Sequence, residues 1–254
     1  MRKLRRCLSV IFLAAFVLAA HAQQPLRIAA AADLQPVLPG ILTQFTSQTG
    51  VHAEASYQSS ATLATSIING APFDLFLAAD LSFPQKVIAA GLAEESAPVP
   101  YARGTLVLWT RNDSRYHQLS MSALSDPGLK SLAIANPEHA PYGRAAQAAL
   151  QHLGLYDTIK PKLVVAENIA QTAQYVSSGN AELGLISLTS ALTPALQNIG
   201  TYVLVPRDAY PPILQGAIIV KNSSNANSAH RLLDFLASPP VIHQLEAGGL
   251  APPQ

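Results

Sequence analysis

Residues 26–50 read LRIAAAADLQPVLPGILTQFTSQTG, and this stretch decides the expected fold class. Residues 26–31 form a short run of mostly apolar side chains, as in a buried strand. Apolar residues then recur at helical spacing from Leu34 to Phe45, and Gly50 follows as a helix-stop residue. A strand that leads into a helix is the basic unit of α/β proteins with mostly parallel sheets. The stretch therefore predicts the first strand and the first helix of such a fold.

The same alternation continues along the rest of the chain. Further strands are predicted at residues 51–57, 73–78, 106–110, 132–135, 183–187, 202–205 and 217–220, and further helices between Ser60 and Gly70, between Asp80 and Gly91, and at residues 143–153, 168–176 and 228–236. A chain of this length can form one sheet or two small lobes. Because no Ser/Gly linker separates two halves, two lobes require the chain to cross between them on strands. The regions 106–110 and 202–206 are the candidate crossings.

Residues 1–22 have the three parts of a secretory signal peptide. A basic start from Arg2 to Arg6 precedes the apolar run 7–20, and the small-x-small sequence AHA ends at Ala22. The apolar run is about 14 residues long, shorter than the ~20 that span a bilayer, which disfavours the alternative of a membrane anchor. We expect cleavage after Ala22 and export to the periplasm. Cys7 is the only cysteine, so the mature chain has no disulfide bond and depends on its core.

The mature chain is mildly acidic and poor in charge. The full sequence has 16 Lys and Arg against 15 Asp and Glu, and 12% of its residues are charged, where about 25% is usual. Four of the basic residues lie within residues 1–6, so 12 remain after cleavage and the formal net charge becomes −3. With 49% hydrophobic residues the chain is not a disordered protein. Because no basic cluster remains, we expect no nucleic-acid partner.

Four junctions that open predicted helices share a chemical character. They lie at residues 31–34, 58–61, 140–143 and 167–170, and small residues surround each of them. A helix start presents free backbone N–H groups and the positive end of the helix dipole. Helix starts that converge can therefore hold an anion without lysine or arginine. The alternative is that Asp33, Ser60 and Asn168 are ordinary helix caps.

The sequence lacks the common motifs of catalysis. It contains no Gly-x-Ser-x-Gly, no Gly-x-x-x-x-Gly-Lys-Ser/Thr and no His-Glu-x-x-His, and its acidic residues do not form a calcium loop. The histidines of the mature chain have no metal-ligand spacing. His139, which follows Glu138, is expected to be a hydrogen-bond partner within a loop rather than a base. We therefore expect that the protein is not an enzyme and that it has no resident cofactor.

Taken in order, several sequence blocks resemble the periplasmic molybdate-binding proteins of ABC importers. The blocks are AAAADL (29–34), YQSSATLA (57–64), NGAPFDLFLAAD (69–80), ANPEHAPYGRAA (135–146), LYD (155–157), KPKL (160–163) and EN (167–168). They cover essentially the whole mature chain, and NGAPFDLF and NPEHAP are the most specific. The resemblance implies a type II periplasmic-binding-protein fold, with two α/β lobes of mostly parallel sheets joined by crossing hinge strands. Its expected division is a signal peptide at 1–22, one lobe at 23–105 with 206–254, and a second lobe at 106–205.

The resemblance also implies a ligand site between the lobes in which an oxyanion is held by hydrogen bonds alone. Molybdenum would be present only as molybdate, and no protein atom would coordinate it directly. Ser60 would donate its hydroxyl and its backbone N–H, while Tyr142 and Ile169 would act through backbone N–H groups. Some relatives have a tyrosine near the ligand, and the corresponding position of this chain is Ser187. The implied oxyanion contacts are Ala32, Asp33, Ser60, Tyr142, Ile169 and Ser187.

Two positions depart from the family pattern. Many relatives have a Ser or Thr hydroxyl at the first turn, where this chain has Ala32 followed by Asp33. A carboxylate about 4 Å from a dianion would be repelled by several kcal/mol. We therefore expect the Asp33 carboxylate to turn inward and cap its own helix at the amide of Gln35, because Pro36 has no N–H. At the second position, Ser187 lacks the long phenolic reach of a tyrosine.

The leading hypothesis is a binding protein that captures molybdate or tungstate as a monomer and delivers it to a membrane permease of an ABC transporter. Neutral donors fit this hypothesis, since they avoid the cost of burying cations. Sulfate has the same charge and shape, so a binder of sulfate or another small anion remains an alternative. An exported enzyme that uses Tyr142 and His139 as acid and base is another, and a ligand-sensing module of a regulator is a third, disfavoured by the signal peptide.

Overall fold

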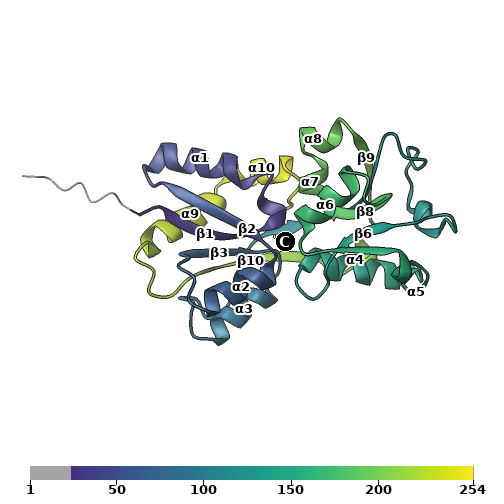
Figure 1. Ribbon diagram of the computed structural model, residues 1–254. Helices are drawn as coiled ribbons and strands as arrows, with labels where there is room; N and C mark the ends of the chain where they lie inside the picture. The colour runs from purple at the N-terminus through teal and green to yellow at the C-terminus, as the bar shows by residue number, and fades with distance from the viewer. Residues whose placement is uncertain (1–23, 254) are drawn as a thin grey trace, which may run out of the picture.

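The computed structural model describes residues 24–253, and these residues form two α/β lobes that lie side by side (Figure 1). The predicted signal peptide at residues 1–22 lies outside the described part of the chain. Each lobe is built on a five-stranded sheet, with strand orders β2-β1-β3-β10-β4 and β7-β6-β8-β5-β9. We call the first sheet with its helices lobe 1 and the second with its helices lobe 2.

The two sheets have the same arrangement of strand directions. In lobe 1, β10 runs antiparallel to both of its neighbours while β1, β2 and β3 are mutually parallel. In lobe 2, β5 takes the place of β10, and β6, β7 and β8 are parallel. The bounds are β1 (Leu26–Ala31), β2 (Ala53–Gln58), β3 (Leu75–Ala78), β4 (Val99–Gly104) and β10 (Ile213–Ile219), and then β5 (Leu106–Arg111), β6 (Leu132–Ala135), β7 (Leu163–Ala166), β8 (Leu183–Ser187) and β9 (Gly200–Leu204).

Helices cover both faces of the lobe 1 sheet, and the alternation of side chains along each strand explains why. On β1, Ile28 and Ala30 pack against one group of helices, whereas Ala29 packs against the other. Figure 1 shows α1, α9 and α10 on one side of this sheet and α2 with α3 on the other. The bounds are α1 (Leu38–Thr49), α2 (Ser60–Ile68), α3 (Ser82–Ala89), α9 (Ala226–Leu236) and α10 (Pro239–Ala247).

Lobe 2 repeats this layering. Leu106 and Leu108 of β5 face the core of α4 and α5, while Val107 and Trp109 face the core of α6 and α7. No helix among residues 24–253 has the length and apolar character that a bilayer crossing needs. The bounds are α4 (Pro141–His152), α5 (Tyr156–Ile159), α6 (Ile169–Ser177), α7 (Leu188–Ala191) and α8 (Pro194–Gln197), with 3-10 turns η1 (Ala32–Leu34), η2 (Met121–Ser125), η3 (Lys160–Lys162) and η4 (Arg207–Ala209).

The chain passes between the lobes twice. Thr105 alone separates β4 of lobe 1 from β5 of lobe 2, and residues 205–212 return the chain from β9 to β10. Because β4 and β10 are hydrogen-bonded neighbours, the two connections lie next to each other at one end of the lobe 1 sheet. This places both crossings close to the regions that the sequence suggested.

The first helix begins later than its apolar spacing predicts. Residues Ala32–Leu34 form a 3-10 turn, and α1 starts only at Leu38. Pro36 contributes to the break, because it has no N–H to donate to the carbonyl oxygen of Ala32, which accepts the amide of Gln35 instead. The sequence also failed to predict β4, β7 and α10. Both strands lie at sheet edges.

Gly143 fixes how closely α4 approaches β6, and this contact is open to a direct test. A methyl group at this position would overlap the backbone of Ala135 and lie 2.7 Å from the carbonyl carbon of Asn136. We expect Gly143→Ala to lower the free energy of unfolding by about 1–3 kcal/mol through overpacking, as measured by urea denaturation. Gly40→Ala in α1 is the control, since nothing lies within 4 Å of that position. Equal stability of the two variants would contradict this packing.

Candidate functional site

Among residues 24–253, four backbone amides at the starts of helices donate no hydrogen bond to another group of the chain. Ala32 opens η1, Ser60 opens α2, Tyr142 is the second residue of α4 and Ile169 opens α6. The hydrogen bonds of residues 24–253 include none donated by these four amides. The helices follow β1, β2, β6 and β7, so the amides lie beyond the carboxyl ends of parallel strands. In open α/β sheets this edge is where ligands bind.

Ser60 is free of the capping role that would compete with ligand binding. Ser59 is the N-cap of α2, and its Oγ accepts the amide of Thr62 at 3.2 Å. The Oγ of Ser60 accepts the amide of Ala79 at 3.0 Å and donates to no residue of the described chain. Ser60 is 1% exposed. Its hydroxyl proton and its amide are therefore both buried donors without an acceptor.

The second lobe contributes Ile169 through a capped helix. Asn168 is the N-cap of α6, and its Oδ1 accepts the amide of Gln171 at 3.0 Å. The cap leaves the amide of Ile169 unpaired. The sequence offered Asp33, Ser60 and Asn168 as ordinary helix caps. Asn168 is a helix cap in the structure, whereas Ser60 and Asp33 are not.

Direct contacts hold the two lobes together around these amides. The amide of Ala61 donates to the carbonyl oxygen of His139 at 3.1 Å, which joins the start of α2 to the loop before α4. Arg144 of lobe 2 forms an ion pair with Asp80 of lobe 1. Ala32, Tyr142 and Ile169 share one apolar cluster that spans the boundary. The structure thus brings the helix starts of both lobes into one closed region.

Asp33 is a buried acid at the centre of this region. Its side chain is fully buried, and its Oδ2 accepts hydrogen bonds from Tyr142 Oη at 3.1 Å and from Gln215 Nε2. Its Oδ1 has no hydrogen-bond partner among the described residues. Burial raises the pKa of Asp33 to about 6, although the bonds from Gln215 and Tyr142 act in the opposite direction. The pKa of Asp33 therefore lies at about 6 instead of at the 3.8 of an ordinary aspartate.

The expectation that Asp33 caps its own helix is wrong. Its carboxylate turns inward, but the amide of Gln35 donates to the carbonyl oxygen of Ala32 at 3.3 Å instead. A 3-10 turn provides that backbone acceptor, so the carboxylate is available to the donors of Tyr142 and Gln215.

Tyr142 joins the lobes through its side chain, which sequence reasoning did not foresee. It is 1% exposed, and its hydroxyl crosses from α4 to Asp33 of lobe 1. The ring passes over Gly104, where any side chain would collide with the phenol. Burial, followed by the charge of Asp33, raises the pKa of Tyr142 well above its ordinary value, so its hydroxyl remains a donor.

Ser187 lies in a hydroxyl network next to the site. It is the N-cap of α7, accepting the amide of Ser190 at 3.2 Å, and its own hydroxyl donates to Ser190 Oγ at 2.9 Å. Thr189 stands between it and Asp33, with its Oγ1 2.8 Å from the Asp33 carbonyl oxygen. Direct contact of Ser187 with a ligand stays a prediction.

Gln215, Tyr101 and Thr189 are functional candidates that the sequence did not reveal. Tyr101 Oη donates to Gln215 Oε1 at 2.8 Å, which orients the amide nitrogen of Gln215 toward Asp33. Gln215 is fully buried in β10. A lone glutamine beside the apolar run 217–220 was the available signal, and the predicted strand began after it.

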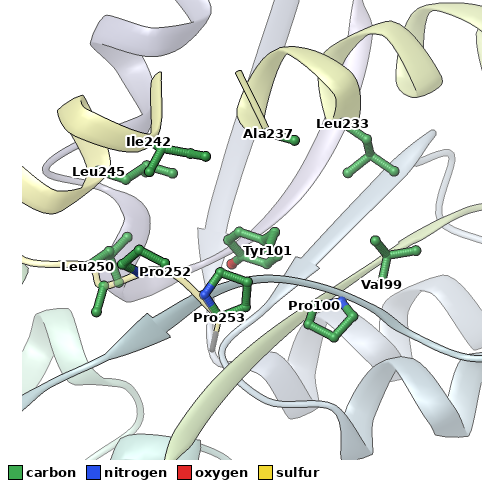
Figure 2. A pocket seen from close by; sticks show the side chains of 11 residues that line it. Val99, Pro100, Tyr101, Leu233, Ala237, Ile242, Leu245, Leu250, Pro252 and Pro253 are labelled. Carbon is green, nitrogen blue, oxygen red and sulfur yellow. The ribbon is translucent and has the colours of Figure 1, made fainter. Parts of the chain in front are cut away.

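An apolar cavity in lobe 1 does not match an anion site. Its volume is about 120 Å³, and Figure 2 shows side chains of β4, α9, α10 and the C-terminal residues around it. Tyr101 is its one polar side chain, and the Tyr101 hydroxyl is used by Gln215. Residues 24–253 also contain no group of three His, Cys, Asp or Glu arranged to hold a metal ion.

The raised pKa of Asp33 predicts a pH-dependent stability. Between pH 3.8 and about 6 the folded protein holds a proton that the unfolded chain releases, so the contribution of Asp33 to stability falls as pH rises through this window. Asp33→Asn removes the effect. The free energy of unfolding of the variant minus that of wild type should be about 2 kcal/mol higher at pH 7.5 than at pH 4.5, as measured by urea denaturation. The variant is therefore relatively more stable at the higher pH. An identical difference at both pH values would contradict a raised pKa.

Known proteins resemble this chain over nearly its whole length. Residues 26–251 match the family described as bacterial extracellular solute-binding protein. The molybdate-binding protein ModA of Azotobacter vinelandii is 36% identical over 241 residues, which cover 94% of this chain and 95% of the relative. The ModA protein of Rhodobacter capsulatus is 35% identical over 205 residues, covering 81% of this chain and 79% of that protein.

Solved structures of other binding proteins are also similar to this chain. The periplasmic molybdate-binding protein of Azotobacter vinelandii superposes with a TM-score of 0.84 at 31% identity, covering 90% of this chain and 100% of that one. The sulfate-binding protein SubI of Mycobacterium tuberculosis gives a TM-score of 0.77 at 14% identity, covering 90% of this chain and 86% of that one, and shares the fold alone. The expected type II periplasmic-binding fold is confirmed. The chain belongs to the bacterial extracellular solute-binding proteins, which are binding proteins and not enzymes.

Proposed function

We propose that this protein captures molybdate or tungstate in the region between its lobes and delivers it to the permease of an ABC importer. The proposal includes export, with removal of residues 1–22 after Ala22, and function as a monomer in the periplasm. The relatives that cover most of the chain carry the name molybdate-binding protein, which favours molybdate over sulfate as the ligand.

The observation that carries the proposal is the set of unpaired amides at Ala32, Ser60, Tyr142 and Ile169. Buried donors without acceptors are costly, so this region gains stability when a ligand supplies the acceptors. A tetrahedral oxyanion has four oxygens that accept hydrogen bonds, and the positive ends of the helix dipoles favour its charge. Arg144, in the first turn of α4, is engaged by Asp80 and does not supply a cation.

Closure of the lobes is part of the proposed mechanism. We assign residues 23–105 with 206–254 to one moving unit and residues 106–205 to the other, with hinges at the two crossings. Opening would break the bond between Ala61 and His139 and the ion pair between Arg144 and Asp80, both of which join the lobes. The ligand would enter the open form. After closure, its four oxygens would accept hydrogen bonds from donors of both lobes.

Ligand-induced stabilisation tests the proposed function. Molybdate or tungstate at 100 times its dissociation constant should add about 2.7 kcal/mol to the stability of the mature protein. For a chain of this size the melting temperature should rise by about 5–10 °C in a thermal-shift experiment. Sulfate and phosphate serve as competitors of similar shape. A shift with sulfate and none with molybdate or tungstate would identify the protein as a binder of a different anion.

Substitution of Ser60 tests the assigned site. Ser60→Ala removes a hydroxyl donor and should weaken molybdate binding by about 1–3 kcal/mol in isothermal titration calorimetry. Ser66→Ala is a matched control on the same helix, because the Ser66 hydroxyl is exposed and bonds only to the carbonyl oxygen of Thr62. If both variants bind as wild type does, the anion lies elsewhere.

A further inference from the structure

One oxygen of the Asp33 carboxyl group has no hydrogen-bond partner among the residues that the structure describes. Tyr142 and Gln215 both donate to Oδ2, whereas Oδ1 is buried and has neither donor nor acceptor among the described residues. An oxygen that accepts two hydrogen bonds is a poor place for a proton. A proton on this carboxyl group would therefore be bound to Oδ1, where no residue between 24 and 253 accepts it.

Oδ1 belongs to the same turn as the unpaired amide of Ala32. The backbone amide of Asp33 itself lies near enough to its carboxyl group to stabilise the charged form. Ala32, Asp33 and Tyr142 are all buried at the lobe boundary, Ala32 and Tyr142 belong to one apolar cluster, and the Tyr142 hydroxyl donates to Asp33. An anion bound by the amide of Ala32 would lie next to the residue whose carboxyl oxygen Oδ1 has no partner among the described residues.

The groups around Asp33 provide no positive charge. Tyr142 from α4 and Tyr101 from β4 are the titratable groups that face it, and Tyr210 lies behind Tyr142. Burial raises the pKa of Tyr101 and of Tyr142 well above the ordinary value, so both stay neutral. Gln215 of β10 and Thr189 of α7 are neutral as well. The ion pairs of residues 24–253 do not include Asp33, and Arg144 is paired with Asp80.

We propose that Asp33 binds the oxyanion in its protonated form, with Oδ1–H donating a hydrogen bond to a ligand oxygen, so that anion binding is coupled to the uptake of one proton from solvent. This inference rests on the proposed function and adds a specificity residue to it. A protonated Asp33 adds a further neutral donor, beside the four amides and the Ser60 hydroxyl, for an oxyanion that has lost all its protons. An ionised Asp33 would repel such an anion from the same position.

The coupling gives a defined pH dependence. When only the protonated protein binds, the apparent dissociation constant rises with pH above the pKa of the acid. With a pKa of about 6 in the free protein, molybdate should bind about 50-fold more weakly at pH 8 than at pH 6. Calorimetry at pH 8 in two buffers of different ionisation enthalpy should show uptake of close to one proton per bound anion.

Asp33→Asn separates this role from a structural one. Asparagine has the same shape and is neutral at every pH, so the variant should bind molybdate with a nearly constant affinity between pH 6 and pH 8 and without proton uptake. At pH 8 it should therefore bind more tightly than wild type. Ser60→Ala is the control, because it should weaken binding while the pH slope and the proton uptake remain.

Three results would overturn the inference. One is a wild-type affinity that does not change between pH 6 and pH 8, without proton uptake. Another is an Asp33→Asn variant that keeps the wild-type slope. The third is that wild type binds phosphate more tightly than molybdate at pH 8 and that Asp33→Asn loses this preference. Such a result would mean that an ionised Asp33 accepts a hydrogen bond from the proton of hydrogen phosphate. Failure of every variant to bind any oxyanion would instead refute the proposed function, and the inference with it.

Discussion

Backbone amides at helix starts need acceptors, and this constraint connects the fold to the site. The amides of Ala32, Ser60, Tyr142 and Ile169 come from four helices that follow parallel strands, two in each lobe. The matching strand orders of the two sheets bring these ends toward the same boundary. A protein with few charges can hold an anion there, since dipoles and hydroxyls replace lysine and arginine.

Asp33 is a fully buried carboxyl group at this boundary, and the contacts around it connect the lobes. Tyr142 reaches it from lobe 2, while Gln215 and Tyr101 support it from lobe 1. A buried carboxyl group fits a dianion site only when it is neutral, because two like charges in a dry environment repel strongly. The bonds that order the carboxyl group therefore join the lobes, and under our proposal they also present a neutral acid to the ligand.

Much of this structure could be predicted from local sequence, and the rest depends on contacts over long distances along the chain. The buried strand at 26–31 and the helix starts near Ser60, Tyr142 and Ile169 follow from apolar runs and cap residues. Gln215 could not be placed, because it meets Asp33 only after the chain returns from lobe 2 on β10. The edge strand β4 was missed because Pro100 and Arg103 interrupt its apolar pattern, whereas the apolar run LVVA of β7 was a signal that could have been used.

The central claim is that neutral donors from both lobes hold the anion. A crystal structure of the mature protein with tungstate tests it most directly, since the anomalous scattering of tungsten locates the anion. One tungsten peak should lie at the lobe boundary, with its oxygens accepting from the amides of Ala32, Ser60, Tyr142 and Ile169. A tungsten site elsewhere, or one whose oxygens are held by a lysine or arginine side chain, would contradict the claim.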